Sequence, residues 1–534
     1  MPDNVWWKRG VIYEIYARSF QDSNGDGVGD LAGIRQRLDY LAWLGIEAIW
    51  ISPIYPSPMA DFGYDISDYC SIDPLFGSLE DFDGLLEDAH RRGLKVVLDY
   101  VPNHTSDRHP WFQQSRSSRD NPRRDWYIWK DPAPGGGPPN NWISNFGGSA
   151  WQFDKATGQY YYHAFLREQP DLNWRNPDVR AAMHEALRFW LRRGVDGFRV
   201  DVMWHLAKSA AFLDDPVNPA YAEGAPDNQR ILQVNSTDQP EVHAFVHGIR
   251  SVIDEFEDRV LIGEIYLPVE RLVAYYGDNL GGAHLPFNFQ LIHATWSAPA
   301  LGRLIEEYEA AIPEGGWPNW VLGNHDQSRI ASRVGAAQAR VAAMLLLTLR
   351  GTPTIYYGDE IGMTDVPVSG ADIRDPWSLN EPGIGVGRDP QRTPMQWSAR
   401  PFAGFSRGRP WLPLGRDFQT ANVETLREEP HSILNLYRNL CALRTEWKAL
   451  RVGAMKMHRA EGDLLIFERA VDDERLLVCL NLGAEARQAE LPGGLGRWRA
   501  LLSTVPARNA GDNVEFEDAV QLRPDEGLVA VLTA

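Results

Sequence analysis

Three acidic residues, Asp201, Glu264 and Asp326, each follow or end a short apolar run of the kind that forms a buried strand. Arg199 and Asp201 would point to the same face of such a strand, and the guanidinium favours the ionised form of Asp201. Glu264 has apolar neighbours, so desolvation is expected to raise its pKa. An ionised nucleophile beside a proton donor meets the requirement of retaining glycoside hydrolysis. Each residue alone could instead cap a helix or form a structural ion pair.

These carboxylates can meet only if their strands are neighbours in one sheet. Apolar runs predict eight strands, at residues 11–16, 48–51, 95–100, 197–202, 260–265, 284–290, 320–323 and 354–357. Helical spacing between them predicts helices at 31–44, 78–93, 177–193, 336–349 and 433–450. Eight strand–helix units predict an α/β protein with a closed (β/α)8 TIM barrel, whose functional groups gather at the carboxyl ends of the strands.

Two segments interrupt or follow the barrel pattern. Residues 104–174, after the third strand, are irregular and dense in aromatic residues, which predicts an inserted subdomain. From residue 455 onward, short alternating strands predict an all-β sandwich domain. We therefore expect a barrel over residues 1–103 and 175–454, the inserted subdomain over 104–174, and a C-terminal β domain over 455–534.

Several strand-end motifs resemble those of the α-amylase superfamily, glycoside hydrolase family 13. The matching segments are 99–104, 197–202, 323–326 and the strand that carries Glu264. The resemblance extends to the oligo-1,6-glucosidase and α-glucosidase branch of this family, which includes α-glucosidases with strong glucosyl-transfer activity. The segments that resemble this branch are 169–174, Asp61 with 63–65, and 387–397. The resemblance covers essentially the whole chain.

The resemblance implies a role for each carboxylate. Asp201 would be the nucleophile that forms a β-glucosyl enzyme, and Glu264 would be the general acid and then the general base. Asp326 would stabilise the positive charge of the transition state. The chain would then be a retaining exo-acting α-glucosidase that releases or transfers single α-glucosyl units from short oligosaccharides of the maltose or isomaltose type. Any hydroxyl acceptor can replace water at the covalent intermediate.

Further residues would bind the substrate: Asp61, Tyr64, His104, Phe146, Phe165, Arg199, His325 and Arg392. Tyr64 would stack under the reacting glucose ring. Asp61 and Arg392 would pair and block further sugar on the non-reducing side, which makes the enzyme exo-acting. Phe146 and Phe165 would wall the aglycone side, with ordinary core packing as the alternative.

Other functions of the same architecture stay open at this point. They are a trehalose synthase or sucrose isomerase, a trehalose-6-phosphate hydrolase, and a catalytically inactive barrel. The intact trio of Asp201, Glu264 and Asp326 argues against an inactive barrel. A trehalose-6-phosphate hydrolase would need extra basic residues to bind its phosphorylated leaving group, and the sequence shows none that can be assigned to this role. Val202, directly after Asp201, resembles the residue of α-1,6-preferring members, but one position leaves the linkage undecided.

An oxygen-rich loop follows the first strand. Its candidate metal ligands are Asp22, Asn24, Asp26, Asp30 and the carbonyl of Val28. The spacing opens like an EF-hand loop, but position twelve is Gly33 instead of the bidentate glutamate. The resemblance implies a structural Ca²⁺ or Mg²⁺ here and no organic cofactor. The alternative is a turn satisfied by its own backbone.

Composition limits the kinds of molecule that this protein is expected to bind. The net charge of −19 argues against nucleic acid or an anionic membrane as the main partner. Three distant cysteines predict neither a disulfide framework nor a cysteine zinc site. The apolar stretch 341–349 is too short to span a bilayer, and the N-terminus lacks a signal core. We expect a cytoplasmic monomer or homodimer that acts on small oligosaccharides or α-glucosides.

Overall fold

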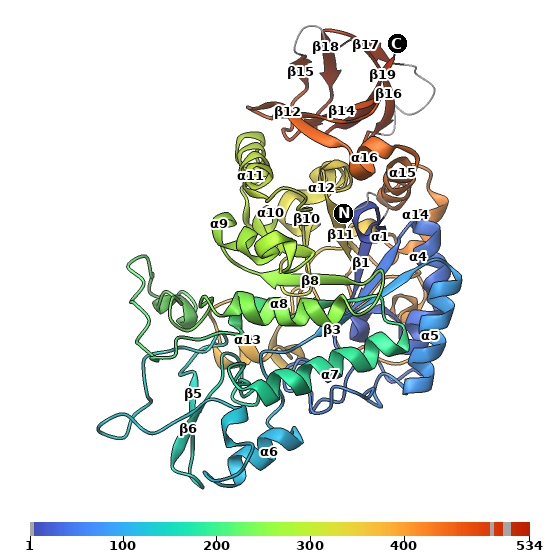
Figure 1. Ribbon diagram of the computed structural model, residues 1–534. Coiled ribbons are helices and arrows are strands. Elements are labelled where there is room, and N and C mark those ends of the chain that lie inside the picture. The colour runs from blue at the N-terminus through green and yellow to red at the C-terminus, as the bar shows by residue number, and fades with distance from the viewer. Residues whose placement is uncertain (1–4, 492–495, 506–513, 534) are drawn as a thin grey trace.

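The computed structural model describes residues 5–491, 496–505 and 514–533. Eight parallel strands close a barrel in the order β1-β11-β10-β9-β8-β7-β3-β2 (Figure 1). They are β1 Ile12–Ile15, β2 Ala48–Ile51, β3 Lys95–Tyr100, β7 Gly197–Val200, β8 Val260–Ile265, β9 Leu285–Asn288, β10 Asn319–Val321 and β11 Thr352–Tyr356. Each corresponds to one of the eight runs expected from the sequence, so the predicted barrel is confirmed.

The barrel strands are buried on both faces. Alternate residues belong to different clusters: Trp50 and Ile262 pack in one, and Ile49 and Leu261 in the other. This alternation is expected where one face of each strand fills the barrel and the other meets the surrounding helices. Continuous burial explains why these strands are apolar runs in the sequence.

Two of the predicted helices form close to their expected bounds. Helix α5, Leu79–Arg91, begins with a capping box in which Ser78 and Asp81 bond to each other's backbone. Helix α7, Pro177–Arg193, has proline in its first turn and ends at Gly194, which is left-handed with φ 104°. These local signals set the bounds correctly.

Two other predicted helices are each divided. Residues 31–44 form α3 Leu31–Gln36 and α4 Leu38–Leu44, because Arg37 leaves helical geometry. Its guanidinium lies 4.1 Å from the Trp397 ring centroid, and such a contact with a distant segment is not visible in a local pattern. Residues 433–450 form α15 Ile433–Glu446 and α16 Lys448–Val452. The remaining helices are α1 Trp6–Arg9, α2 Ala17–Phe20, α6 Pro110–Ser117, α8 Val242–Ile253, α9 Val269–Leu272, α10 Gln290–His293, α11 Ala298–Ala311, α13 Pro376–Asn380 and α14 Val423–Glu428.

Helix α12, Ile330–Thr348, starts earlier than predicted and contains a kink at Gly335. Within the described residues it is the one helix long and apolar enough to cross a membrane. Of the apolar window, 61% is buried inside the protein. The helix also lies against α15, which is the position of a core helix.

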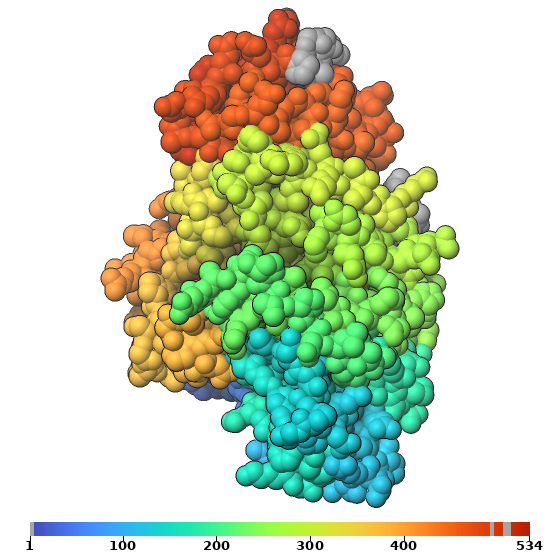
Figure 2. Space-filling model, turned by 90° about the vertical axis from the view of Figure 1, so that its left-hand side faces the viewer, coloured from blue at the N-terminus to red at the C-terminus, as the bar shows by residue number. Residues whose placement is uncertain are grey.

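The segment between β3 and α7 carries its own small antiparallel sheet, in the order β4-β6-β5. Its strands are β4 Trp129–Lys130, β5 Trp151–Asp154 and β6 Gln159–Tyr162. Trp142, Trp151 and Tyr162 form part of a separate aromatic cluster. Figures 1 and 2 show this segment at the end of the molecule opposite the C-terminal strands.

The C-terminal region is all β. A six-stranded antiparallel sheet has the order β12-β13-β14-β19-β16-β17, and a two-stranded sheet pairs β15 with β18. The strands are β12 Ala454–Glu461, β13 Leu464–Val471, β14 Glu474–Asn481, β15 Arg487–Glu490, β16 Arg497–Ser503, β17 Glu515–Phe516, β18 Ala519–Leu522 and β19 Gly527–Thr533. Leu477 and Cys479 of β14 pack in one cluster with Val520 and Leu522 of β18, so the core lies between the two sheets.

Candidate active site

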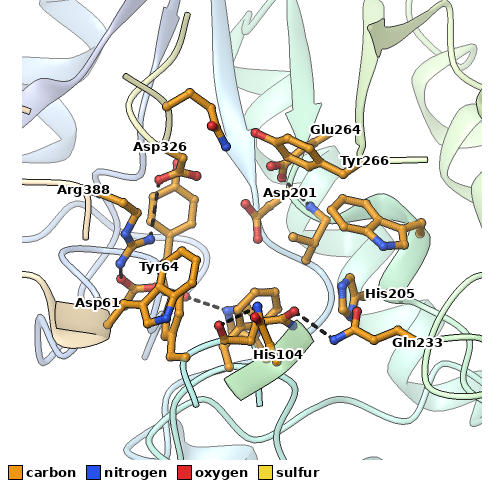
Figure 3. Close-up of a pocket in the computed structure, with 18 residues that line it drawn as sticks. Asp61, Tyr64, His104, Asp201, His205, Gln233, Glu264, Tyr266, Asp326 and Arg388 are labelled. Atoms are coloured by element: carbon orange, nitrogen blue, oxygen red, sulfur yellow. Dashed lines mark hydrogen bonds and ion pairs between the residues drawn. The ribbon is translucent and has the colours of Figure 1, made fainter. Parts of the chain in front are cut away.

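A cavity of about 360 Å³ opens at the carboxyl ends of the barrel strands. Asp201 and Glu264 line it from the adjacent strands β7 and β8, and Asp326 lines it from the loop after β10. Figure 3 shows the three side chains around the same space. The barrel therefore brings together three carboxyl groups that the sequence separates widely.

The guanidinium of Arg199 contacts two of these carboxyl groups, those of Asp201 and Glu264, and also a third one nearby. Arg199 is 1% exposed. Its Nη1 lies 2.8 Å from Asp201 Oδ1, and its Nη2 lies 2.7 Å from Glu264 Oε2. Nη1 also lies 2.9 Å from Oδ1 of Asp99, which is opposite Arg199 in the β3–β7 register. Arg199 and Asp201 are close to each other, as expected, but the arginine forms ion pairs with three acids instead of one.

Burial controls the protonation of these acids. It raises the pKa of Glu264, as its apolar neighbours predicted, and Arg199 lowers it by less. Burial also raises the pKa of Asp201 well above its usual range, although Arg199 opposes this shift. Arg199 favours the ionised form of Asp201, as expected, but burial outweighs it, so the guanidinium alone does not keep this carboxyl ionised. Because one buried cation faces several carboxyl groups, we infer that the cluster retains a proton.

Asp326 has the opposite environment. Burial raises the pKa of this carboxyl, but His325, Arg392 and Arg388 outweigh it and bring the pKa well below the usual range. The Nη2 of Arg392 binds Asp326 Oδ1, and the Nη1 of Arg388 lies 3.5 Å from the same oxygen. Asp326 is therefore ionised near neutral pH, in contrast to the group around Arg199.

The expected pair of Asp61 and Arg392 is not formed. Arg388 takes this place, with Nη2 at 2.7 Å from Asp61 Oδ1 and at 2.7 Å from Asp375 Oδ1. Arg392 is fully buried behind the cavity, where its Nε donates to the carbonyl of His325. The two arginines are four residues apart in an irregular loop, so their order in the sequence does not tell which one faces the cavity.

Aromatic rings stack on one another beside the Asp326 end of the cavity, around His325. Tyr64 lines the cavity and stacks on His325, with ring centroids 5.5 Å apart. Tyr16 also stacks on His325, with ring centroids 5.6 Å apart. His104 also lines the cavity, and burial lowers its pKa to about 4, so its ring is neutral near pH 7. Arg199, His325 and Arg392 do not line the cavity and instead hold the groups that do.

Comparison with known proteins identifies this arrangement. Residues 14–453 match the family model "Alpha amylase, catalytic domain", and residues 453–529 match a domain of unknown function. The chain belongs to the α-amylase family of glycoside hydrolases. It is 42% identical to a probable alpha-glucosidase of Rhizobium meliloti, over 92% of each chain. It is 40% identical to an oligo-1,6-glucosidase of Heyndrickxia coagulans, over 93% of this chain and 95% of the relative.

Solved structures of family members have the same fold over the full length. An alpha-glucosyl transfer enzyme, XgtA, has a TM-score of 0.93 at 41% identity, covering 99% of this chain and 100% of its own. The trehalulose synthase MutB of Pseudomonas mesoacidophila has a TM-score of 0.91 at 35% identity and full coverage of both chains (100%). A trehalose-6-phosphate hydrolase of Bacillus licheniformis has 0.89 at 36%, covering 99% and 100%. The fold is thus shared by enzymes with different reactions.

Apart from its four carboxyl groups and Arg388, the cavity is lined by aromatic, amide, histidine and apolar side chains. Phe146 and Phe165 line it as expected, and they also pack against each other with ring centroids 5.7 Å apart. The lining residues that the sequence reading missed are Asn145, Trp204, His205, Asn228, Gln233, Tyr266, Gln327, Trp377 and Arg388. Most lie in the long segments after β7 and β11. Arg388 belongs to the recognised motif at 387–397, whereas Trp204, His205, Asn228, Gln233 and Trp377 lie outside the recognised motifs. Tyr266 and Gln327 directly follow strand-end motifs and could have been found from that position.

Val202 adopts an unusual backbone conformation beside the two acids. Its φ of 37° is left-handed, which is costly for a β-branched residue. In this conformation its N–H donates to Glu264 Oε2 at 2.8 Å. The fold thus holds Glu264 from two sides, by Arg199 and by a strained backbone amide.

The expected metal loop has local hydrogen bonds. Asp22 Oδ1 accepts from the N–H groups of Asn24 and Gly25, and Asp26 Oδ1 accepts from Val28 N–H. Asp30 caps α3 by accepting from Gly33 N–H. No group of three or more acidic, histidine or cysteine side chains suited to a metal is found in residues 5–491, 496–505 and 514–533. The described side chains therefore fit the turn alternative better than a cation site.

Proposed function

We propose that this enzyme is a retaining exo-acting α-glucosidase that releases or transfers single α-glucosyl units from short α-glucosides. The supporting observation is that Asp201 and Glu264, which line the cavity, contact the same guanidinium, that of Arg199, and that the Asp61–Arg388 ion pair lines the same cavity. Two carboxyl groups that share Arg199 favour the separation of roughly 5–5.5 Å typical of retaining enzymes over the wider spacing that an attacking water needs.

In the proposed first step, Asp201 attacks the anomeric carbon while Glu264 protonates the glycosidic oxygen. The proton retained by the acid cluster is on Glu264 in the reactive form, which leaves Asp201 ionised beside Arg199. Asp326 stays ionised because of its two arginines and stabilises the developing positive charge. In the second step, Glu264 takes a proton from water or from an acceptor alcohol, which then attacks the covalent intermediate.

The Asp61–Arg388 ion pair supports exo action. It occupies the end of the cavity that would otherwise receive sugar on the non-reducing side. Asp375 holds Arg388 from behind, so the guanidinium is fixed by two carboxylates. A glucosyl unit that contacts this pair has no room for a preceding residue, and the enzyme removes one unit at a time.

The lining of the open side bears on the alternative reactions. Arg388 is the one arginine or lysine that lines the described cavity, and Asp61 and Asp375 already neutralise it. A phosphorylated leaving group would need a further cation, which disfavours a trehalose-6-phosphate hydrolase. An isomerase of the trehalulose synthase type requires no charge there and is the second candidate, because the 0.91 TM-score leaves the fold in common.

A product profile tests the proposal. The purified enzyme is incubated with maltose, isomaltose, sucrose, trehalose and starch, each with and without an alcohol acceptor, and products are followed by chromatography. We expect glucose from disaccharides, glucosides of the acceptor, and little release from starch. Isomerised disaccharide as the main product would replace the proposal with the isomerase. Short dextrins released from the interior of starch would contradict exo action.

A further inference from the structure

Glu14 on β1 is fully buried and does not line the cavity, yet it contacts a residue of the active site. Its Oε1 lies 2.5 Å from Nδ1 of His325 and 3.4 Å from the backbone nitrogen of the same residue. Its Oε2 is buried and has no hydrogen-bond partner in the described part of the chain. An ionised carboxylate with one unpartnered buried oxygen is strongly disfavoured.

The charges near Glu14 act in both directions. Burial raises its pKa well above the usual range, Arg199 lowers it, and Asp326 and Asp99 raise it. The same burial lowers the pKa of His325 well below its usual range. A neutral carboxylic acid beside a neutral imidazole agrees with both shifts. The proton in the short contact is then bonded to Glu14 Oε1, and His325 Nδ1 accepts the hydrogen bond.

The far side of His325 leads to the same assignment. Its Nε2 lies 2.8 Å from the hydroxyl of Tyr64, which lies 3.1 Å from Asp99 Oδ2. Asp99 accepts from Arg199, so the single hydroxyl proton of Tyr64 points to Asp99. Tyr64 then has no proton to give to His325, and Nε2 must be the donor.

We propose that Glu14 is a positioning residue: as a protonated acid it donates to His325 Nδ1 and keeps the imidazole proton on Nε2. The hydrogen bonds then run in one direction, from Glu14 through His325 and Tyr64 to Asp99 and its partner Arg199. Nε2 also lies 3.5 Å from Asp326 Oδ2, so its N–H faces the anionic side of the cavity. The consequence for turnover, though not the tautomer itself, rests on the proposed function.

The first test is the tautomer, which needs no substrate. Histidine is labelled with ¹⁵N, and the ring signals of His325 are assigned by their loss in His325→Gln. We expect one unprotonated nitrogen, Nδ1, and one protonated nitrogen, Nε2. Glu14→Gln should keep this pattern because its amide N–H₂ also donates to Nδ1. Protonated Nδ1, alone or with protonated Nε2, would overturn the proposal in either protein.

The second test is kinetic. Glu14→Met leaves Nδ1 without a donor and frees the ring, so kcat/KM for a disaccharide should fall at least about tenfold. Glu14→Gln should stay within about threefold of the unmodified enzyme, since the hydrogen-bond direction is kept. In the His325→Gln background, Glu14→Met should add no further loss. Equal losses for the Gln and Met variants, or a further loss in the double variant, would refute a role through His325.

Glu360→Met is the matched control. Glu360 is a fully buried glutamate that accepts from the hydroxyls of Tyr13 and Tyr40, away from the cavity. Its variant should lower the melting temperature but leave the His325 ring signals unchanged. If Glu14→Met does not fold, the ring signals of the unmodified and Glu14→Gln proteins still decide the question. An inactive enzyme with the expected tautomer would count against the proposed function only.

Discussion

The cavity and the loop at residues 22–30 are both rich in acidic side chains, but they use them differently. In the loop, the acids are close in sequence and accept N–H groups two to seven residues away. In the cavity, Asp201, Glu264 and Asp326 come from three strands and have arginines as their main partners. Acids that are neighbours in sequence are satisfied by local backbone, whereas acids brought together by the barrel keep perturbed protonation.

This difference has a physical origin. A carboxylate within a turn finds backbone donors without any tertiary structure. A carboxylate at the end of a buried strand loses water and gains a few fixed charges, which raise or lower its pKa according to their sign. Variants of the two regions should therefore behave differently.

The largest effect is expected for Asp201→Asn. Without the nucleophile, kcat/KM on disaccharides should fall by about 10⁴-fold or more, while the fold is retained. Steady-state rates and the melting temperature measure the two properties. Asp22→Asn in the loop should give the reverse pattern, with a lower melting temperature and a rate within about threefold of normal. Comparable losses of activity in both variants would remove the distinction between the regions.

Glu264→Gln should have the next largest effect. Loss of the acid should lower kcat/KM for disaccharides by about 10²–10⁴-fold, and less for aryl glucosides whose leaving group needs little protonation. In the unmodified enzyme the protonated form is active, so the rate falls as the pH rises through the raised pKa of Glu264. That alkaline limb should vanish in the variant. Equal losses on both substrates would contradict the acid role.

Opening the closed end of the cavity should have a moderate effect. The triple variant Asp61→Ser, Asp375→Asn and Arg388→Ser removes the guanidinium together with both carboxylates that pair with it, so none of the three charges is left buried and unpaired. Its kcat/KM for maltose should fall at least about tenfold through lost charge-assisted hydrogen bonds, and maltotetraose should give some maltose beside glucose. Chromatography of early products measures this. Glucose as the sole early product would show that another part of the protein enforces exo action.

Metal removal should have the smallest effect. We propose that Ca²⁺ or Mg²⁺ adds stability at the loop of Asp22, Asn24, Asp26, Val28 and Asp30, although its local hydrogen bonds favour the turn alternative. If the ion binds, a chelated sample should melt about 3–5 °C below a calcium-loaded one with unchanged kcat. Equal melting temperatures in metal-free and metal-loaded samples would establish the turn alternative.

The sequence predicted much of the fold because the barrel pattern is local. Short apolar runs and helical spacing located all eight strands, and the capping box at Ser78 located α5. Contacts between distant segments were not predictable in this way. The break at Arg37, which lies over Trp397, is one example, and the early start of α12 is another difference from the expected bounds.

The candidate site divides in the same way. Residue type and strand-end position were enough to select Asp201, Glu264 and Asp326, and the family resemblance added Tyr64 and His104. All five line the cavity. The aromatic and amide residues of the open side were missed, because irregular loops carry no periodic pattern. The partner of Asp61 was predicted incorrectly, since either of two arginines four residues apart could have reached it.

By itself, then, the sequence determined which strands form the barrel and which carboxylates stand at their ends, because both depend on residue spacing along one segment. Only the tertiary structure decided that Arg199 contacts three acids, that Arg388 closes the cavity, and that Glu14 meets His325. Glu14 and His325 are 311 positions apart, and no local pattern relates them. Burial and charge pairing are properties of the assembled barrel, so protonation is decided only when the strands close.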